Sequence, residues 1–498
     1  MTATRTEPTP SADPWEDLQT AALLGTDRRP LPAPAGSPAQ PDARPELPPA
    51  AARRLAILLA GRTGSAGGTL ANLTELLPQW LAGAVAHGYR PPAALVPALL
   101  DGARARSELR TDVVALTGPL GSWLAERNKD WRFVLRTTTG TTTGGAGGDA
   151  PSGDRLWHEG LFAERVTHLI ALRRSDPAAG LDLLRGTWPT ERAEDRLLFL
   201  DALQDGLGAE DEPFLEAALG DRSKNVRATA AELLSTLPGS ALATRMAERA
   251  RAVVRLSDDG RRLLVAPPTE CDADMQRDGI PPASPTGRGE RAWWFGEVVA
   301  AAPLRTWTDA TGLTAQGLLA LPVADAGAGA GDSSWADDLR EAWARAAVRQ
   351  HDADWARALL GPAPRPGRGG RGARAAGAPA KLLSVLPPPE RAVWTAAFIR
   401  THGLGEAFQL LGACATPWTP PLSTAVVAAL ERAAGSGAYP WSHSGVLGMT
   451  ERALAPATAP AVEALAADAA PDTAWAETFA RLAGTLRFRA AMLAELAG

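Results

Sequence analysis

The sequence predicts an all-α protein in which antiparallel helix pairs stack along the chain as an α-solenoid. The first reason is composition: the 498 residues include only four Ile and two Tyr, which favour strands, whereas the helix formers Ala, Leu, Arg and Glu are abundant. The second reason is spacing. Apolar residues recur at i, i+4, i+7, i+8 and i+11, as in Val226, Ala230, Leu233, Leu234 and Leu237. This spacing places them on one face of a helix.

Stretches rich in Gly, Pro or Thr separate the helical patterns, and the sequence holds 49 Gly and 42 Pro. From these breaks we expect eight segments: an N-terminal helix and Pro-rich tract at 1–49, a helical block at 50–136, a Thr/Gly linker at 137–153, a HEAT-like helical block at 154–256, a hairpin or irregular insertion at 257–287, a Trp-rich helical block at 288–361, an Arg/Gly linker at 362–379 and a C-terminal helical block at 380–498. Inside 50–136, further breaks are expected at 61–68, 88–92 and 118–119.

Residues 254–266 depart from the helical pattern. The pair Asp259-Gly260 stands between two apolar runs. Such a pair favours a primed two-residue turn, because this turn needs positive φ at both central residues. The segment is therefore either a small β-hairpin or a helix that ends at Ser257 and continues as an extended tail. Residues 271–285 have no periodic pattern, and we expect them to be irregular.

The C-terminal block ends in the most regular amphipathic pattern of the chain. Its apolar positions step by three or four residues, and its outer face is expected to carry three arginines. The apolar positions are Trp475, Phe479, Leu482, Leu486, Ala490, Leu493 and Ala497, and the arginines are Arg481, Arg487 and Arg489.

Charge and cysteine content exclude several classes of protein. The 51 Lys and Arg against 56 Asp and Glu give a net charge of -5, which argues against a general polyanion-binding protein. Cys271 and Cys414 are too few for a disulfide scaffold or a Cys-rich zinc fold, and Cys414 lies in an apolar run typical of a buried position. No apolar stretch of about 18 uncharged residues is present, and residues 1–14 lack the pattern of a signal peptide. We therefore expect a cytoplasmic protein that does not enter a membrane.

No pattern typical of a catalytic, cofactor or metal site stands out. The Gly-rich run 61–69 fails the P-loop pattern, because Gly68 stands where Lys is required and Arg62 where the first Gly is required. His158 opens a zinc-helix pattern, but Phe162 occupies the place of the second His. We therefore expect no cofactor and no metal, and we favour a non-catalytic protein over an enzyme whose site the sequence does not reveal.

Tryptophan is over-represented, with 16 Trp against two Tyr. Several Trp fall in the 288–361 block, including Trp293, Trp294, Trp335 and Trp343. Trp at helical spacing is more often core between stacked helices than surface. Because Trp is also enriched at interface hot spots, a groove lined by some of these residues is the sequence's candidate surface for a protein partner.

Two Arg-rich segments are further candidates for contact. Asp27, Arg28 and Arg29 either end a short helix with exposed charges or form part of a partner contact. The run 365–374 contains four Arg and no acid, which is typical both of a solvated linker and of a segment that follows a nucleic-acid backbone. Since no aromatic residue is interleaved to stack on bases, we favour the linker.

Residues 211–237 (DEPFLEAALGDRSKNVRATAAELLSTL) resemble a HEAT repeat, a helix pair that stacks into a curved solenoid. Asp221 in the turn and Arg227 early in the second helix stand where that family places a ladder of charges. We expect Asp221 to cap the second helix and Arg227 to reach the turn of the adjoining unit. One helix pair cannot bury its apolar face alone, so at least about three are expected.

The whole chain also resembles an uncharacterised family of actinobacterial proteins, on the segments 21–29, 290–294 and 335–360. Members of that family are often encoded beside MoxR-class AAA ATPases and von Willebrand A-type proteins. The resemblance implies a partner in such a system. Together these observations predict a scaffold for protein–protein interaction; the alternative is a HEAT-like nucleic-acid-binding protein, of the kind that includes DNA glycosylases using Trp and an acidic residue.

Overall fold

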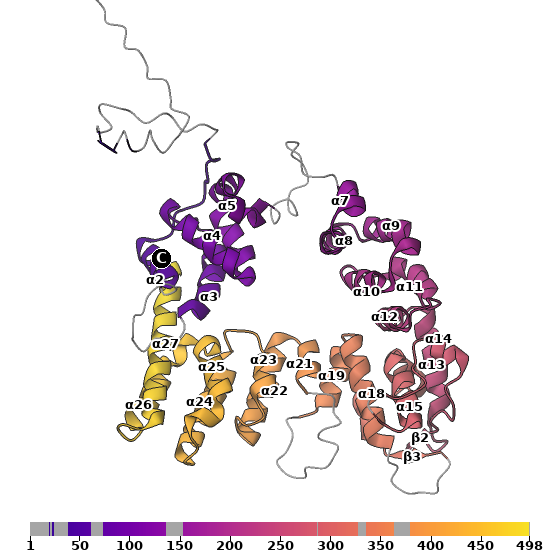
Figure 1. Cartoon of the computed structure of the whole chain (residues 1–498). Helices are drawn as coiled ribbons and strands as arrows, with labels where there is room; N and C mark the ends of the chain where they lie inside the picture. Colours follow the sequence, from indigo (N-terminus) through magenta and orange to yellow (C-terminus); the bar gives the residue numbers. More distant parts are fainter. Residues whose placement is uncertain are drawn as a thin grey trace, which may run out of the picture. The chain divides into compact units, whose positions relative to one another are not determined.

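The computed structural model describes residues 19, 22–23, 38–60, 73–135, 153–285, 287–326, 335–362 and 379–497. These residues are mostly helical, with one small three-stranded sheet, and they form two compact units (Figure 1). The N-terminal unit comprises Met1–Leu59 and Pro78–Thr141, and the C-terminal unit comprises Ala60–Leu77 and Thr142–Gly498. The expectations for 27–29, 61–69 and 365–374 lie outside the described residues.

Short helices around a Leu- and Trp-containing core make up the N-terminal unit, in which Leu55, Trp80, Leu99 and Leu116 are fully buried. Its elements are α2 (Pro49–Ala60), the part of α3 (Leu73–Ala86) from Pro78 onward, η1 (Ala93–Leu95), α4 (Val96–Ala105), η2 (Ser107–Leu109), α5 (Arg110–Arg127) and η3 (Lys129–Trp131). The break predicted at 88–92 is confirmed, since no helix covers those residues.

The break predicted at 118–119 is a kink inside α5 that Arg44 holds. Gly118 has non-helical backbone angles (φ 50°, ψ -138°), and Pro119 has no N–H to donate to the carbonyl of Ala115. The Arg44 guanidinium donates to that carbonyl at 2.7 Å and pairs with Asp42 at 2.7 Å. A Cβ at position 118 would lie 2.3 Å from Arg44 Nη2, so glycine is required there.

In the C-terminal unit most helices pack on one of the next three in the chain: α8 on α9, α10 on α12, α13 on α15, α15 on α18, α22 on α24 and α26 on α27 (Figure 1). Its helices are α7 (Gly153–Glu159), α8 (Phe162–Ser175), α9 (Pro177–Thr187), η4 (Trp188–Thr190), α10 (Ala193–Ala202), η5 (Ala209–Asp211), α11 (Glu212–Ala218), α12 (Lys224–Ser235), α13 (Ala241–Val253), α14 (Ala273–Arg277), α15 (Glu290–Ala301), α16 (Arg305–Thr311), α17 (Ala315–Ala320), α18 (Trp335–Arg349), α19 (Ala353–Leu360), α21 (Pro379–Val385), α22 (Pro388–His402), α23 (Phe408–Gly412), α24 (Pro420–Gly435), η6 (Pro440–His443), α25 (Ser444–Ala453), η7 (Pro456–Thr458), α26 (Ala459–Asp468) and α27 (Ala474–Ala497).

Two apolar clusters form the core of this unit. The larger one runs from Trp157 to Leu410, and the second from Ala392 to Leu486. Cys414 is buried in the second cluster, as its apolar surroundings in the sequence predict. Among the described residues, no helix is both long enough and apolar enough to cross a lipid bilayer.

The predicted β-hairpin is confirmed, although its turn differs from the expected one. β1 (Val254–Leu256) pairs antiparallel with β2 (Leu263–Val265). The loop is longer than two residues: the Ser257 N–H donates to the Arg262 carbonyl at 2.9 Å, and only Gly260 has positive φ. A third strand, β3 (Val323–Asp325), pairs parallel with β2 and lies within the 288–361 block that was expected to be helical.

The expectation of irregular structure at 271–285 was wrong for its centre. Asp272 caps α14 there by accepting a hydrogen bond from the Met275 N–H at 2.7 Å. Met275 and Ile280 are buried against the core of the unit. The segment is too short to show a helical period, so its fold depends on these tertiary contacts.

On the C-terminal helix α27, one predicted arginine position was wrong. Arg489 is buried rather than on the outer face, and the predicted apolar positions Ala490, Leu493 and Ala497 are exposed. The Arg489 Nη1 donates to the Leu454 carbonyl at 2.6 Å, and burial lowers the pKa of Arg489 to about 10. The buried stripe continues through Met492 and Leu496, because the face of a straight helix drifts from a fixed step of three and four residues.

The most deeply buried ion pair joins α8 to the start of α11. The side chains of Arg173 and Asp211 are 1% and 3% exposed, and two hydrogen bonds of 2.7 and 2.8 Å join them. Arg173 also donates to the carbonyls of Pro177, Leu203, Asp205 and Gly206. The buried charge is thus satisfied by a carboxylate and by the backbone of the intervening chain.

Removing the carboxylate should destabilise the protein strongly. We expect Asp211→Ala to lower the free energy of unfolding by about 3–5 kcal/mol, because Arg173 would remain buried without its counter-charge. Urea unfolding followed by circular dichroism measures the change. The exposed pair Arg185–Asp182 is the control, and Arg185→Ala should cost less than about 0.5 kcal/mol. Equal effects of the two substitutions would contradict this role.

Candidate protein-interaction site

The residues 211–237 form the predicted helix pair, α11 and α12, but the charges in its turn make other contacts than expected. Asp221 accepts a hydrogen bond from the Ser223 N–H at 2.7 Å and pairs with Arg196 of α10 at 2.7 Å. Arg227 donates to the Asp221 carbonyl of its own turn at 2.7 Å, not to an adjoining unit. The bridge to the preceding helix is therefore made by Arg196, which the sequence analysis did not single out.

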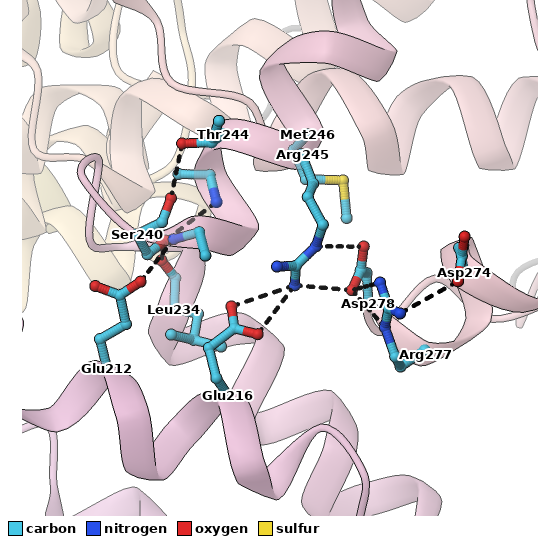
Figure 2. Close-up of polar contacts among 12 residues, drawn as sticks. Glu212, Glu216, Leu234, Ser240, Thr244, Arg245, Met246, Asp274, Arg277 and Asp278 are labelled. Carbon is cyan, nitrogen blue, oxygen red and sulfur yellow. Dashed lines mark hydrogen bonds and ion pairs between the residues drawn. The ribbon is translucent and has the colours of Figure 1, made fainter.

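A second node of charge fixes the 271–285 segment to the helices (Figure 2). Asp278 is buried directly after α14, and its carboxylate accepts hydrogen bonds from Arg245 and Arg249 of α13 at 2.7 to 3.0 Å. Arg245 also reaches Glu216 of α11 at 3.2 Å. Burial alone would raise the pKa of Asp278, but the hydrogen bonds and charges of Arg245 and Arg249 outweigh it and hold the pKa below its usual value.

The same close-up shows how α13 is joined to the pair before it (Figure 2). Glu212 of α11 accepts a hydrogen bond from the Ala241 N–H at 2.7 Å. Ser240 caps α13 through the Ala243 N–H and donates to the Leu234 carbonyl of α12 at 3.0 Å. Free N–H groups at the start of α13 are thus satisfied by Glu212 of α11 and by Ser240, whose hydroxyl donates to α12.

Similar bridges continue toward the Trp-rich helices. Arg349 of α18 pairs with Glu232 of α12 at 2.6 Å and donates to the Ala300 carbonyl of α15 at 2.8 Å. Arg345 of α18 pairs with Glu297 of α15 at 2.5 Å. These contacts hold α18 at a fixed position relative to the earlier helices.

Three of the predicted Trp residues fasten connecting segments to the helices. The indole N–H groups of Trp293 and Trp294 donate to the carbonyls of Pro281 and Pro282 at 3.2 and 3.0 Å. Trp335 donates to Asp325 at the end of β3 at 3.1 Å. Trp293 and Trp335 are half-buried, whereas Trp294 is buried. We therefore leave Trp294 out of any binding surface.

Trp343 is buried in the core together with two neighbours. Its ring centroid lies 5.8 Å from that of Trp307 and 5.1 Å from that of Trp355. Trp343 is therefore out of reach of a partner. Trp355, on α19, lies at the edge of this row and forms part of the wall of a groove.

The groove at Trp355 has a volume of about 840 Å³ and a lining of both polar and apolar residues. Residues of α16, of the start of α17 and of α19 line it, among them Arg305, Thr308, Gln316 and Asp354. Asp352 caps α19 by accepting a hydrogen bond from the Trp355 N–H at 2.9 Å, which orients the first turn of that helix.

An apolar hollow of about 500 Å³ adjoins this groove and shares Arg357, Gly361 and Pro362 with it. Its other walls come from α22 and the preceding turn: Leu386, Pro389, Glu390, Val393, Trp394 and Ala397. We call the two hollows together the α19 groove. Trp394 is fixed in it by a 2.9 Å hydrogen bond to the Gly361 carbonyl.

Arg357 forms the ridge between the two hollows. Its guanidinium makes a two-pronged contact with Glu390 of α22 at 2.9 and 3.1 Å and pairs with Asp354 at 2.7 Å. The hydrogen bonds from Arg357 lower the pKa of Glu390, so this carboxyl remains ionised near neutral pH. The α19 groove thus has an apolar floor on one side and fixed charges across its middle.

The described part of the chain offers little for chemistry at this groove. Within it, no group of three or more His, Cys, Asp or Glu side chains is placed to hold a metal ion. The Cys414 thiol lies 3.4 Å from the Thr395 hydroxyl, and burial raises its pKa, which disfavours the reactive thiolate. What the groove does offer is a shaped, partly apolar surface.

Comparison with known families gives one match, which extends over residues 32–496. The model that matches is described as a family of unknown function, DUF5691. The chain belongs to the DUF5691 family. No curated protein matches the chain, and no solved structure matches it. Since the DUF5691 match covers both units, the helices that line the α19 groove fall within the family region.

Sequence reasoning missed the most informative groove residues. Arg357, Glu390 and Val393 come from helices on either side of the predicted 362–379 linker, so no local pattern connects them. The Trp content of the 288–361 block did point to α19. However, it could not show that Trp343 and Trp355 are both buried and that only Trp355 borders the groove.

The ionic node at Asp278 should give stability a specific dependence on pH. We expect Asp278→Asn to lower the free energy of unfolding by about 2 kcal/mol at neutral pH. Because the folded-state pKa of Asp278 is depressed, its contribution is complete above the unfolded pKa of roughly 3.9 and is lost as the pH falls through the folded pKa. The difference between the two proteins should therefore shrink below about pH 4.

Urea unfolding at a series of pH values measures this difference. Asp274→Asn is the matched control, because Asp274 lies on the same short helix and its side chain is exposed. The control should follow the unsubstituted protein at every pH. A difference for Asp278→Asn that stays constant from neutral to acid pH would contradict the assignment.

Proposed function

We propose that this chain is a non-catalytic scaffold that binds a protein partner through the α19 groove. The single observation that carries the proposal is the groove itself, in which an apolar floor around Val393 and Trp394 lies beside the fixed charges of Arg357 and Glu390. Apolar anchors surrounded by polar groups are the usual composition of a protein-binding surface.

We further propose that the C-terminal unit is an α-solenoid of HEAT-like helix pairs. The packing of helices on their neighbours in the chain supports this, because in a solenoid each repeat contacts mainly the next. The bridges from Arg173, Arg196 and Arg245 to the later carboxylates Asp211, Asp221 and Asp278 support it as well. Such an arrangement offers a long surface for a partner but few converging polar groups for catalysis.

For the partner, we propose a MoxR-class AAA ATPase or a von Willebrand A-type protein. This part rests on the resemblance of the chain to proteins encoded beside such genes. Co-expression of the full chain with the products of its neighbouring genes, followed by purification through a tag on one component, tests it directly. Recovery of a stable complex is the expected result. Recovery of nucleic acid alone would instead favour the alternative hypothesis of a nucleic-acid-binding protein. Its binding should then weaken steeply as the salt concentration rises.

A substitution in the groove should weaken this complex without unfolding the protein. Val393 is 61% exposed, and we expect Val393→Asp to lower partner affinity by about tenfold or more, because a carboxylate would be desolvated on the apolar floor. Isothermal titration with the purified partner measures the change.

Leu198→Asp is the matched control, since Leu198 is an apolar residue of α10 that is 48% exposed and outside the groove. It should leave affinity unchanged. If Val393→Asp binds as tightly as the unsubstituted protein, or if both variants lose binding equally, the α19 groove is not the binding site.

A further inference from the structure

A separate hollow in the C-terminal unit combines aromatic walls with two carboxylates. It has a volume of about 350 Å³ and lies between α24, α26 and α27. Glu431 and Asp468 line it, together with Leu465, Trp475 and Phe479. Its volume is at the lower end of the roughly 300–1,000 Å³ of ligand pockets, which suits one side chain rather than a large ligand. It shares no lining residue with the α19 groove.

The two carboxylates of this hollow are not among the acids that pair with arginines of α27. Glu451 and Glu463 pair with Arg481 and Arg487 of α27. Glu431 and Asp468, by contrast, are exposed, and among the described residues neither side chain takes part in an ion pair or hydrogen bond. Two negative charges therefore line the hollow without a cation of this part of the chain to balance them.

An exposed aromatic pair stands next to the hollow. The Trp475 indole N–H donates to the Ala438 carbonyl at 2.6 Å, and the His443 ring centroid lies 6.4 Å from that of Trp475. Both ends of the segment 438–443 therefore lie close to Trp475. Between them, Tyr439 and Trp441 stack almost in parallel with ring centroids 4.2 Å apart.

These two rings are far more exposed than aromatic core residues. Tyr439 is 59% exposed and Trp441 is 65% exposed. The pair presents flat apolar faces beside a hollow that already contains Trp475 and Phe479. Large exposed aromatic side chains beside a polar rim are typical of a surface that a partner covers.

We infer that this hollow, together with the Tyr439–Trp441 pair, binds an arginine side chain presented by an extended segment of a protein partner. A guanidinium is planar, so it can stack on aromatic faces while its N–H groups donate to carboxylates such as Glu431 and Asp468. The apolar stem of the arginine would lie along Leu465, which is half-buried in the wall of the hollow. Lysine lacks the planar group and fits this combination less well.

The flanking residues of the partner segment would lie on Tyr439 and Trp441. Their stacked arrangement gives a flat surface at low cost in side-chain entropy, since each ring already restricts the other. In this arrangement the hollow recognises the charge, and the aromatic pair adds contact area for the residues that flank the arginine. The hollow shares no lining residue with the α19 groove, so a negative binding result at one site does not contradict the proposal for the other.

A pair of synthetic peptides tests the inference on the full chain. The first carries one arginine between glycine, serine and proline residues with blocked ends. The second has citrulline in place of arginine, which keeps the shape and removes the charge. We expect the arginine peptide to bind about tenfold more tightly or better in isothermal titration. The indole N–H signals of Trp441 and Trp475 should shift in NMR spectra on its addition.

Variants locate the binding. The double substitution Glu431→Gln and Asp468→Asn should reduce the affinity for the arginine peptide to that for the citrulline peptide, and Trp441→Ala should weaken both peptides. Glu406→Gln is the control, because Glu406 is an exposed acid outside the hollow. Circular dichroism should show unchanged helix content in every variant, since none of these side chains is buried.

Three results would overturn the inference. The citrulline peptide could bind as tightly as the arginine peptide, the double variant could retain full affinity, or the arginine peptide could fail to bind at about millimolar concentration. Each of these would show that the two carboxylates do not form an arginine site.

Discussion

The burial of arginine charges between successive helices is the constraint on which the C-terminal unit depends. A guanidinium cannot lie inside a protein unless carboxylates and carbonyls satisfy it. Arg173 meets this condition only because Asp211 and the carbonyls of 203–206 come together around it. Of the 51 basic residues only three are Lys, and the forked donor group of arginine is what allows one side chain to join several segments.

These bridges determine where the candidate surfaces lie. Arg349 ties α18 to α12 and α15, and α19 follows α18 directly in the chain. The row of rings from Trp307 through Trp343 to Trp355 then fixes the wall of the α19 groove. Arg357 extends the same principle to α22 through Glu390. The groove is therefore built on rigid helices, which favours a pre-formed binding surface.

Composition and periodicity were sufficient to predict helices, because apolar spacing is a local property. They predicted the helix pair at 211–237, and a hairpin near 254–266 was one of the two alternatives that they left open. They failed where the decisive contact is distant in the chain. Asp278 looked like part of an irregular stretch, since its partners Arg245 and Arg249 lie about thirty residues earlier on another helix.

The candidate site, like the fold, could be predicted from the sequence only in part. Trp enrichment indicated the right block of sequence. Burial decides which Trp can contact a partner. Burial in turn depends on packing between distant segments, which local sequence patterns do not reveal. Trp343 and Trp355 are both buried, at 1% and 3% exposure, and only Trp355 borders the groove. The exposed pair Tyr439 and Trp441 carries no local signal beyond two aromatic residues beside a proline.

Hydrogen exchange measured by mass spectrometry on Asp221→Ala tests most directly whether helix neighbours hold this unit together. The side chain of Asp221 forms an ion pair with Arg196 of α10. Local coupling predicts faster exchange in α10 to α13 (193–253) and unchanged protection in α24 to α27 (420–497). An equal loss of protection in both regions would contradict the account, because it would mean that the whole unit opens as one cooperative body.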